Sequence, residues 1–235
     1  MSVRTVILCG GKGTRAYPQT ATVPKPLLEV AGQPVVRQVM EIYAAHGFTD
    51  FVLAAGYKKE MLQDFADKLE APWTVDVVDT GEETNTGGRV RAVADVVGDT
   101  FFVTYSDGLG DVDLAQTLEY HRSHDGFATM TTVPLPSQYG TVDFDDSGRV
   151  QGFKEKPKLP DHYINAGFFV MDRRCFDAWP TPGEDLERDV MPAFARAGGL
   201  FVYKHHGFWK SMDTYKDALD LTALCDAGVR PWMQL

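Results

Sequence analysis

The 235-residue sequence has no uninterrupted apolar run of the roughly eighteen residues that a membrane-spanning helix needs. It also lacks the basic segment followed by an apolar stretch that marks a secretory leader. Cysteine is scarce: Cys9, Cys175 and Cys225 are odd in number, far apart and without a C-x-x-C pair. This pattern argues against a disulfide or zinc framework and favours reduced thiols. We therefore expect no membrane contact and a cytoplasmic location.

The sequence also lacks an excess of positive charge. Its 23 lysines and arginines are outnumbered by 33 aspartates and glutamates, so the formal net charge is −10 at pH 7. Nucleic-acid surfaces need clustered Lys and Arg to neutralise phosphate backbones, so we expect no nucleic-acid partner. A hydrophobic content of 44% over 235 residues is enough for one full core. We predict a single domain over residues 1–235.

A glycine-rich stretch near the N-terminus, Cys9-Gly10-Gly11-Lys12-Gly13-Thr14-Arg15, is the most informative part of the chain. It follows the apolar run 6–8, which predicts a buried strand. Glycines let backbone N–H groups approach a phosphate closely, and Arg15 and Lys25 add two cations. The stretch favours a polyphosphate site. A Gly-rich turn with incidental charges is the simpler alternative, which this stretch alone leaves open.

Two better-known phosphate motifs do not fit the stretch. No Gly-Lys-Ser or Gly-Lys-Thr follows the glycines, which excludes the kinase-type phosphate loop. Gly11, Gly13 and Ala16 match the letters of the dinucleotide fingerprint, but that motif must open a helix. Prolines at positions 18, 24 and 26 follow instead, and a proline inside a helix costs about 3 kcal/mol or more. We predict an extended, irregular loop here, which weakens a dehydrogenase interpretation.

Strand and helix patterns alternate along the first half of the chain. The expected strands cover residues 6–8, 51–55, 75–78 and 101–105. The expected helices cover residues 33–46, 58–69 and a segment that begins at Gly87-Gly88-Arg89. The inner face of this last helix is expected to carry Val90, Val93, Val96 and Val97. Such alternation is typical of a doubly wound sheet that binds ligands at the carboxyl ends of its strands.

After residue 126 the predicted strands lie closer together. We expect strands at 127–133, 140–144, 150–153, 163–171 and 201–203, and an amphipathic helix at 184–197. The acidic run 143–148 is a hairpin turn rather than a calcium loop, because Lys154 stands where the terminal Glu should be. His121, His124 and the pair His205-His206 lack further metal ligands nearby, so we expect them at the surface. The predicted fold is α/β, a Rossmann-like doubly wound mixed sheet.

Four polar residues have both a structural and a functional interpretation. Asp107 follows an apolar strand, where a carboxylate beside phosphates could hold Mg²⁺, but an Asp-Gly turn explains it equally well. Asp213 has the features of a helix N-cap. Lys156 precedes a proline, which predicts extended backbone and, by itself, an ordinary surface lysine. Arg89 lies in a first helical turn, where its charge opposes the helix dipole, which indicates a role elsewhere.

The glycine-rich stretch, L-C-G-G-K-G-T-R with P-K-P-L, resembles the signature G-G-x-G-T-R…P-K-P of the sugar-phosphate nucleotidyltransferases. Within that family, V-D-T-G at 78–81 and T-G-G-R at 86–89 are most similar to glucose-1-phosphate cytidylyltransferases. Further matches follow in family order to about residue 214: Y-S-D-G at 105–108, E-K-P at 155–157, N-A-G-F-F at 165–169 and G-F-W-K-S-M-D-T at 207–214. The resemblance implies the nucleotide-diphospho-sugar transferase (GT-A-like) fold, with a nucleotide-binding part at about 1–125 and a sugar-phosphate-binding part at about 126–235.

The resemblance implies transfer of a nucleoside monophosphate from a nucleoside triphosphate to a sugar 1-phosphate, with CTP and glucose 1-phosphate favoured and pyrophosphate released. It implies that Arg15, Lys25 and Asp107 are catalytic and that Asp107 and Asp213 bind Mg²⁺. The implied nucleotide-binding residues are Leu8, Gly10, Gly11, Gly13, Thr14, Arg15, Lys25, Thr84, Gly88, Arg89 and Ser106. The implied sugar-phosphate-binding residues are Gly140, Glu155, Lys156, Asn165 and Gly167.

Some features depart from the family pattern. The connection between residues 69 and 75 is short, and Lys12 and Ala16 replace apolar residues. The choice of base and sugar therefore stays open, including a guanylyl-, thymidylyl- or uridylyltransferase acting on another hexose or heptose 1-phosphate, and so does assembly into a homo-oligomer. The chain ends about twenty residues after Asp213, so we expect no added repeat domain. A non-catalytic nucleotide-sensing relative is the alternative from another class, but such a relative could dispense with Asp107 and Asp213.

Overall fold

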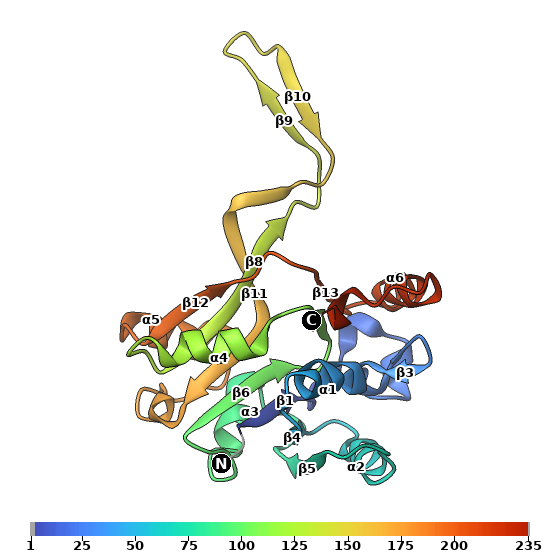
Figure 1. The fold of residues 1–235 in the computed structure, drawn as a ribbon, viewed down its shortest axis with the longest axis vertical. Coiled ribbons are helices and arrows are strands. Elements are labelled where there is room, and N and C mark those ends of the chain that lie inside the picture. Colours follow the sequence, from blue (N-terminus) through green and yellow to red (C-terminus); the bar gives the residue numbers. More distant parts are fainter. Residues whose placement is uncertain (1–2, 235) are drawn as a thin grey trace.

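The first strand of the chain sends its side chains alternately to two apolar clusters. In β1 (Arg4–Leu8), Ile7 packs in one cluster and Val6 and Leu8 pack in the other. Successive residues of a strand point to opposite faces of a sheet, so a strand that is apolar at every position must be covered on both sides. The computed structural model describes residues 3–234 and shows such a sheet, with helices on both faces (Figure 1).

Within residues 3–234, the central sheet has seven strands in the order β12-β8-β11-β6-β1-β4-β5. β1 pairs in parallel with β4 and β6, β4 with β5, and β12 with β8, while β11 runs antiparallel between β6 and β8. The further strands are β4 (Asp50–Ala55), β5 (Thr74–Asp79), β6 (Thr100–Tyr105), β8 (Ala128–Pro136), β11 (Lys158–Asp172) and β12 (Leu200–Lys204). The predicted doubly wound mixed sheet is confirmed.

The helices divide between the two clusters. The cluster that contains Ile7 takes side chains from α1 (Val35–Ala45), α2 (Lys59–Asp67), α4 (Leu114–Arg122) and α6 (Tyr215–Asp226). The cluster that contains Val6 takes side chains from α3 (Thr86–Ala92), α5 (Met191–Arg196) and the short helices η4 (Arg173–Phe176) and η5 (Leu186–Val190). The body also contains two more short helices, η2 (Gln19–Ala21) and η6 (Pro231–Met233), and the strand pair β2 (Glu29–Val30) and β3 (Gln33–Pro34). None of the helices in the described part of the chain is long and apolar enough to cross a membrane.

Three predicted helices differ from the observed ones at their ends. The helix expected at 184–197 begins as the π-turn η5 and becomes α5 only at Met191, where Pro192 in the first turn has no N–H for the regular pattern. The last helix begins at Tyr215 with Thr214 as N-cap, so the N-cap interpretation of Asp213 was wrong. Helix α3 ends at Ala92, and Val96, expected on its inner face, is 41% exposed.

The expectation that the histidines lie at the surface was wrong for two of them. His121 is 3% exposed, because it falls on the inward stripe of α4 with Leu114, Thr117 and Leu118. His205 is 8% exposed, and its Nε2 lies 2.9 Å from Asp111 Oδ1.

The hairpin of β9 (Thr141–Phe144) and β10 (Val150–Lys154) projects from the ends of β8 and β11, away from the rest of the molecule (Figure 1). We call residues 139–157 the arm. Five large apolar side chains of the arm are exposed: Tyr139, Val142, Phe144, Val150 and Phe153. The Ser137 N–H donates to the Pro157 carbonyl at 2.9 Å and closes the base of the arm. Lys156, expected to be extended, has φ +47° in the left-handed region, where the chain turns back toward β11.

Candidate active site

Two adjoining cavities open at the carboxyl ends of the central parallel strands, the end at which open α/β sheets bind ligands. Cavity 1, about 210 Å³, lies between the glycine-rich loop after β1 and the start of α3. Cavity 2, about 400 Å³, lies between the end of β6 and the middle of β11. Tyr105, Asp107 and Thr86 line both cavities, so the cavities meet at the end of β6.

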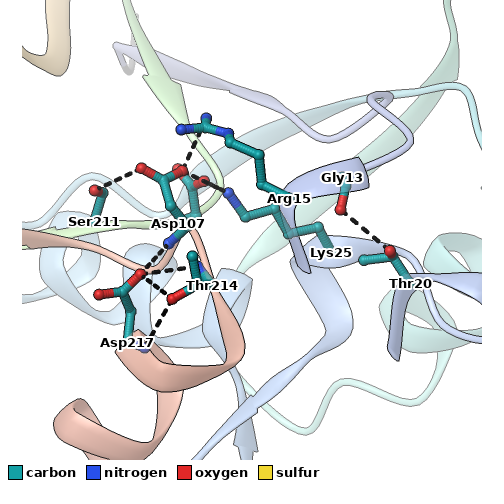
Figure 2. A network of polar contacts seen from close by, with 9 residues as sticks. Gly13, Arg15, Thr20, Lys25, Asp107, Ser211, Thr214 and Asp217 are labelled. Carbon is teal, nitrogen blue, oxygen red and sulfur yellow. Dashed lines mark hydrogen bonds and ion pairs between the residues drawn. The ribbon is translucent and has the colours of Figure 1, made fainter. Parts of the chain in front are cut away.

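Two carboxylates converge on one ammonium group where the cavities meet (Figure 2). Lys25 Nζ contacts Asp107 Oδ2 and lies 3.0 Å from Asp213 Oδ1. Arg15 Nη2 reaches the same Asp213 oxygen at 2.9 Å, and the Ser211 hydroxyl donates to the other oxygen at 3.1 Å. Asp107 and Asp213 are 106 positions apart in the sequence, and the fold brings them together as the resemblance implied.

The four charged groups differ in exposure. The side chains of Lys25 and Asp107 are 12% and 18% exposed, Asp213 is 29% exposed, and Arg15 is 72% exposed. Burial alone would raise the pKa of the Asp213 carboxyl, but the charges of Lys25 and Arg15 and the hydrogen bonds from Lys25 and Ser211 hold that pKa below its ordinary value. The carboxylate is therefore ionised at neutral pH and available to bind a cation.

The glycine-rich loop is irregular, as predicted, but it is not extended. It forms short 3₁₀ turns, including η1 (Thr14–Ala16) and η3 (Lys25–Leu27), because prolines permit single turns while preventing a longer helix. Gly13 has φ +61°, and a Cβ there would lie 2.8 Å from the Cβ of Lys25. The Gly13 carbonyl accepts a hydrogen bond from the Thr20 hydroxyl at 3.1 Å. Glycine at position 13 thus lets the loop fold back onto Lys25.

Arg89 lines cavity 1, but the residue is only 3% exposed and its guanidinium bonds to the protein. Over distances of 2.6 to 3.2 Å it donates to the Thr80 hydroxyl and to the carbonyls of Gly10, Ala55, Gly81 and Glu82. A Cβ at Gly10 would lie 1.9 Å from its Nη1. Burial lowers the pKa of this guanidinium. Arg89 therefore ties the loops after β1, β4 and β5 together, which sequence reasoning had not foreseen.

The glycines that open α3 are packed against a neighbouring loop. The N–H groups of Gly87 and Gly88 donate to the Glu184 carbonyl at 2.8 and 3.1 Å, so this helix end is already capped. A Cβ at Gly87 would lie 2.7 Å from the Gly183 carbonyl oxygen. The T-G-G-R pattern thus has a packing reason, and Gly88 does not line either cavity.

Cavity 2 is shaped by an irregularity in β11. The register of β11 against β8 shifts between Asn165 and Phe169, and Gly167 within it has φ +80°. The Asn165 side-chain oxygen accepts from the Gly167 N–H at 2.8 Å, and a Cβ at Gly167 would lie 2.6 Å from the Tyr105 ring. The Trp209 indole donates to the Ala166 carbonyl at 2.8 Å and forms another wall. Asn165 and Gly167 therefore line cavity 2 together with Asp107, and their binding to a sugar phosphate stays a prediction.

The structure places most of the implied site residues at these cavities, but not all of them. Lining cavity 1 are Leu8, Gly10, Gly11, Gly13, Lys25, Thr84, Arg89, Ser106 and Asp107; lining cavity 2 are Arg15, Asp107, Asn165, Gly167 and Asp213. Thr14 lines neither. Gly140, Glu155 and Lys156 lie on the arm and line neither cavity, so their binding to a sugar phosphate stays a prediction (Figure 1).

Residues outside the implied set also line the site, among them Thr86, Tyr105, Glu187 and Trp209. Tyr105 and Trp209 stand inside the motifs Y-S-D-G and G-F-W-K-S-M-D-T. Their places in these motifs could have identified them as residues that line the site. Glu187 stands in no motif. Its position follows from the packing of η5 against α3, which also places the Thr86 hydroxyl 3.4 Å from Glu187 Oε2.

The carboxylate pair fits a magnesium ion held together with a substrate. Among residues 3–234, no group of three or more His, Cys, Asp or Glu side chains could hold a metal alone. Mg²⁺ is usually bound by one or two carboxylates together with substrate phosphates rather than by a full protein cage. The Lys25 ammonium between Asp107 and Asp213 shows that a cation is accommodated at this position.

Comparison with known proteins finds relatives that match nearly the whole chain. A glucose-1-phosphate cytidylyltransferase of Salmonella typhi is 34% identical over 254 aligned residues, covering 98% of both chains. A mannose-1-phosphate guanylyltransferase of Mycobacterium tuberculosis is 34% identical over 97% of this chain and 66% of its own. The crystal structure of HddC from Yersinia pseudotuberculosis complexed with GMP-PN superposes with a TM-score of 0.73, at 22% identity, over 94% of this chain and 98% of that one.

The sequence profile of one family covers almost all of the chain. The nucleotidyl transferase profile matches residues 4–225, a range that holds Arg15, Lys25, Asp107 and Asp213. With the fold and the converging carboxylates in place, we conclude that this chain is an enzyme that belongs to the nucleotidyl transferase family.

Proposed function

We propose that the enzyme transfers a nucleoside monophosphate from a nucleoside triphosphate to a sugar 1-phosphate, with CTP and glucose 1-phosphate as the favoured substrates. The observation that carries this proposal is the meeting of Lys25, Asp107 and Asp213 between two cavities. One cavity is lined by glycines and suits a nucleotide, and the other adjoins it at Asp107 and suits a second substrate. The residues up to about 125 would supply the nucleotide side, and most of the sugar-phosphate side would come from later residues.

In the proposed reaction a phosphate oxygen of the sugar 1-phosphate attacks the α-phosphorus of the nucleoside triphosphate. The bond from that phosphorus to the oxygen bridging to the β-phosphate breaks, and pyrophosphate leaves with the electron pair. Several negative charges converge during this step. Catalysis therefore depends on positioning and charge neutralisation and needs no protein nucleophile.

Each charged side chain has a role in this scheme. Backbone N–H groups of the glycine-rich loop and the exposed Arg15 would hold the β- and γ-phosphates. Lys25 would pair with the α-phosphate and offset the charge that grows there. Asp107 and Asp213 would hold Mg²⁺, which when bound neutralises phosphate charge and polarises the α-phosphorus. Lys156 lies on the arm, and it would pair with the sugar phosphate when the arm brings it to a bound sugar phosphate.

A guanylyltransferase that acts on mannose 1-phosphate is a second candidate within the family. The mannose-1-phosphate guanylyltransferase of Mycobacterium tuberculosis is as similar in percentage identity as the cytidylyltransferase, although this chain covers only 66% of its length. Coverage of 98% of both chains favours the cytidylyl alternative. A thymidylyl- or uridylyltransferase is the next candidate, and the non-catalytic sensor is the least favoured because both carboxylates are present.

The proposal is tested by a matrix of nucleoside triphosphates against sugar 1-phosphates, read by pyrophosphate release with and without Mg²⁺. We expect the highest turnover with CTP and glucose 1-phosphate. A higher rate with GTP and mannose 1-phosphate would reassign the specificity within the family. No turnover with any pair would contradict the proposed reaction.

The metal assignment is tested by Asp107→Asn and Asp213→Asn. Each variant should abolish Mg²⁺-dependent pyrophosphate release, because the amide is a weaker ligand without the negative charge. Asp226→Asn, at an exposed position on α6, is the matched control and should behave as the wild type. Thermal unfolding should show that all three variants fold. Near-normal turnover in either site variant would contradict the assignment.

A cytoplasmic location and a homo-oligomer complete the proposal. Cys9, Cys175 and Cys225 are free thiols, and free thiols are typical of proteins from a reducing compartment. The exposed apolar side chains of the arm are the feature that favours self-association.

A further inference from the structure

A short antiparallel ribbon connects the two carboxylates of the site. β7 (Gly108–Gly110) pairs with β13 (Trp209–Ser211), with Gly108 opposite Ser211 and Gly110 opposite Trp209. Asp107 directly precedes β7, and Asp213 follows β13 by two positions. The Met212 N–H donates to the Asp107 carbonyl at 2.9 Å and extends the pairing up to the carboxylates. The ribbon therefore determines the spacing between Asp107 and Asp213.

The opposite end of this ribbon is held by His205 and Asp111. His205 Nε2 lies 2.9 Å from Asp111 Oδ1 and 3.1 Å from the Phe208 carbonyl oxygen. The Asp111 N–H donates to the same carbonyl at 3.2 Å, so the Phe208 carbonyl oxygen is shared by Asp111 and His205. The His205 N–H donates to the Thr132 carbonyl of β8 at 2.8 Å, which ties the assembly to the central sheet.

Packing at this end leaves little room for another arrangement. His205 is 8% exposed, and Leu109 and Met212 of the ribbon are buried. A Cβ at Gly207 would lie 2.2 Å from Asp111 Oδ1, and a Cβ at Gly110 would lie 3.0 Å from the Phe208 carbonyl oxygen. The Asp111 carboxylate oxygen and the imidazole are thus confined against a turn that only glycine fits. Such confinement is typical of groups that keep a site in one geometry.

We propose that His205 and Asp111 are positioning residues that keep the β7–β13 ribbon in register and thereby set the separation of the metal-binding carboxylates. They touch neither cavity, so they act only through Asp107 and Asp213. The inference rests on the proposed function, because it concerns the metal assigned to those carboxylates. The histidine pair had no explanation from the sequence, and the structure separates its members: His205 is buried, whereas His206 is exposed.

The test compares His205→Ala, His205→Gln and His206→Ala. The first readout is the affinity for Mn²⁺, which electron paramagnetic resonance measures in the presence of a non-hydrolysable CTP analogue. The second is the Mg²⁺ concentration that gives half-maximal pyrophosphate release. For His205→Ala we expect both metal affinities to weaken about tenfold and kcat to fall about tenfold. Binding of the CTP analogue without metal should stay within about twofold of the wild type.

The conservative and control variants separate positioning from general stability. Glutamine places an amide N–H near the position of Nε2, so His205→Gln should restore metal affinity to within about threefold of the wild type. His206→Ala should match the wild type throughout. If His205→Ala does not fold, Asp111→Ala and Asp111→Asn provide the same comparison from the other side, with loss in the first and recovery in the second.

Three results would overturn the inference: unchanged Mn²⁺ affinity in His205→Ala, equal loss of metal and metal-free nucleotide binding, or no recovery in His205→Gln. Failure of the proposed function would look different, because the wild type itself would then release no pyrophosphate with any substrate pair or bind no Mn²⁺.

Discussion

At the scale of single residues, the unusual feature of the site is that Lys25 takes the place assigned to a metal. Its ammonium is 12% exposed and lies between two carboxylates that would otherwise repel each other. Two like charges a few ångströms apart in a partly buried site repel each other with an energy of several kcal/mol at an effective dielectric constant near 20. A divalent ion at the carboxylates would release Lys25 toward the substrate phosphates.

The prediction at this scale concerns Lys25→Met. Turnover should fall about a hundredfold to a thousandfold, or about 3–4 kcal/mol of barrier, because a preorganised cation is lost. Mn²⁺ binding without nucleotide should become about tenfold tighter, because the carboxylates no longer have a competing ammonium. Pyrophosphate release and electron paramagnetic resonance measure the two effects. Lys68→Met, at an exposed position after α2, is the control. Weaker Mn²⁺ binding in Lys25→Met would contradict the competition.

At the scale of elements, helix α4 buries an ionisable group against the sheet. His121 Nδ1 lies 2.9 Å from the Thr129 hydroxyl of β8, and the His124 ring shares the same hydroxyl at 2.8 Å. Asp172 lies 3.6 Å from His121 Nε2 and is paired with Arg174. Burial lowers the pKa of His121 to about 4; Asp172 opposes this shift, and the His124 and Arg174 charges add to it.

The lowered pKa makes the stability of the protein depend on pH. Between about pH 6.5 and 4 the unfolded chain binds a proton at His121 that the folded chain does not, so the free energy of unfolding falls as pH falls. The contribution is fully present above pH 6.5, and about 3 kcal/mol of the free energy of unfolding should be lost by pH 4. Denaturant unfolding at several pH values would measure this slope in the wild type and in His121→Gln. An equal slope in both proteins would show that another group is responsible.

At the scale of the whole molecule, the arm is the part that the body does not cover. Phe144 is 68% exposed, Phe153 63% and Tyr139 77%. All three belong to the arm, whose hairpin projects from the sheet (Figure 1). Contiguous apolar side chains of this kind mark protein interfaces. A second copy of the chain is the partner we expect, since an arm that projects from each subunit can pack on its neighbour.

The prediction at this scale is therefore an oligomer that depends on the arm. Wild-type protein should elute above the monomer mass of 26.0 kDa in size-exclusion chromatography with light scattering. The double variant Phe144→Ser and Phe153→Ser should shift toward the monomer while the body keeps its unfolding temperature. Gln151→Ser with Lys154→Ser, polar changes on the same hairpin, should leave the mass unchanged. A monomeric wild type would refute the expectation.

Local patterns in the sequence predicted several elements well. Apolar runs and helical spacing located β1, β4, β5, β6, α1 and α2 close to their observed bounds, because the period of burial is written directly into neighbouring residues. The capped start of α6 was placed one residue early because Asp213 and Thr214 are both good caps, and Asp217 selected Thr214 through a capping box. His121 was missed although its spacing from Leu114 and Leu118 carried the signal.

Short-range patterns and side-chain chemistry are enough to predict the alternating elements, the glycine-rich turn and the chemical character of Lys25, Asp107 and Asp213. The folded chain is needed to show that Arg89 serves backbone carbonyls, that His205 is buried on Asp111 while His206 is exposed, and that Glu155 and Lys156 stand on an arm apart from both cavities. These outcomes depend on contacts between segments distant in the chain. The packing of the sheet determines which acceptor a buried donor contacts. The residues next to that donor in the sequence do not specify this packing.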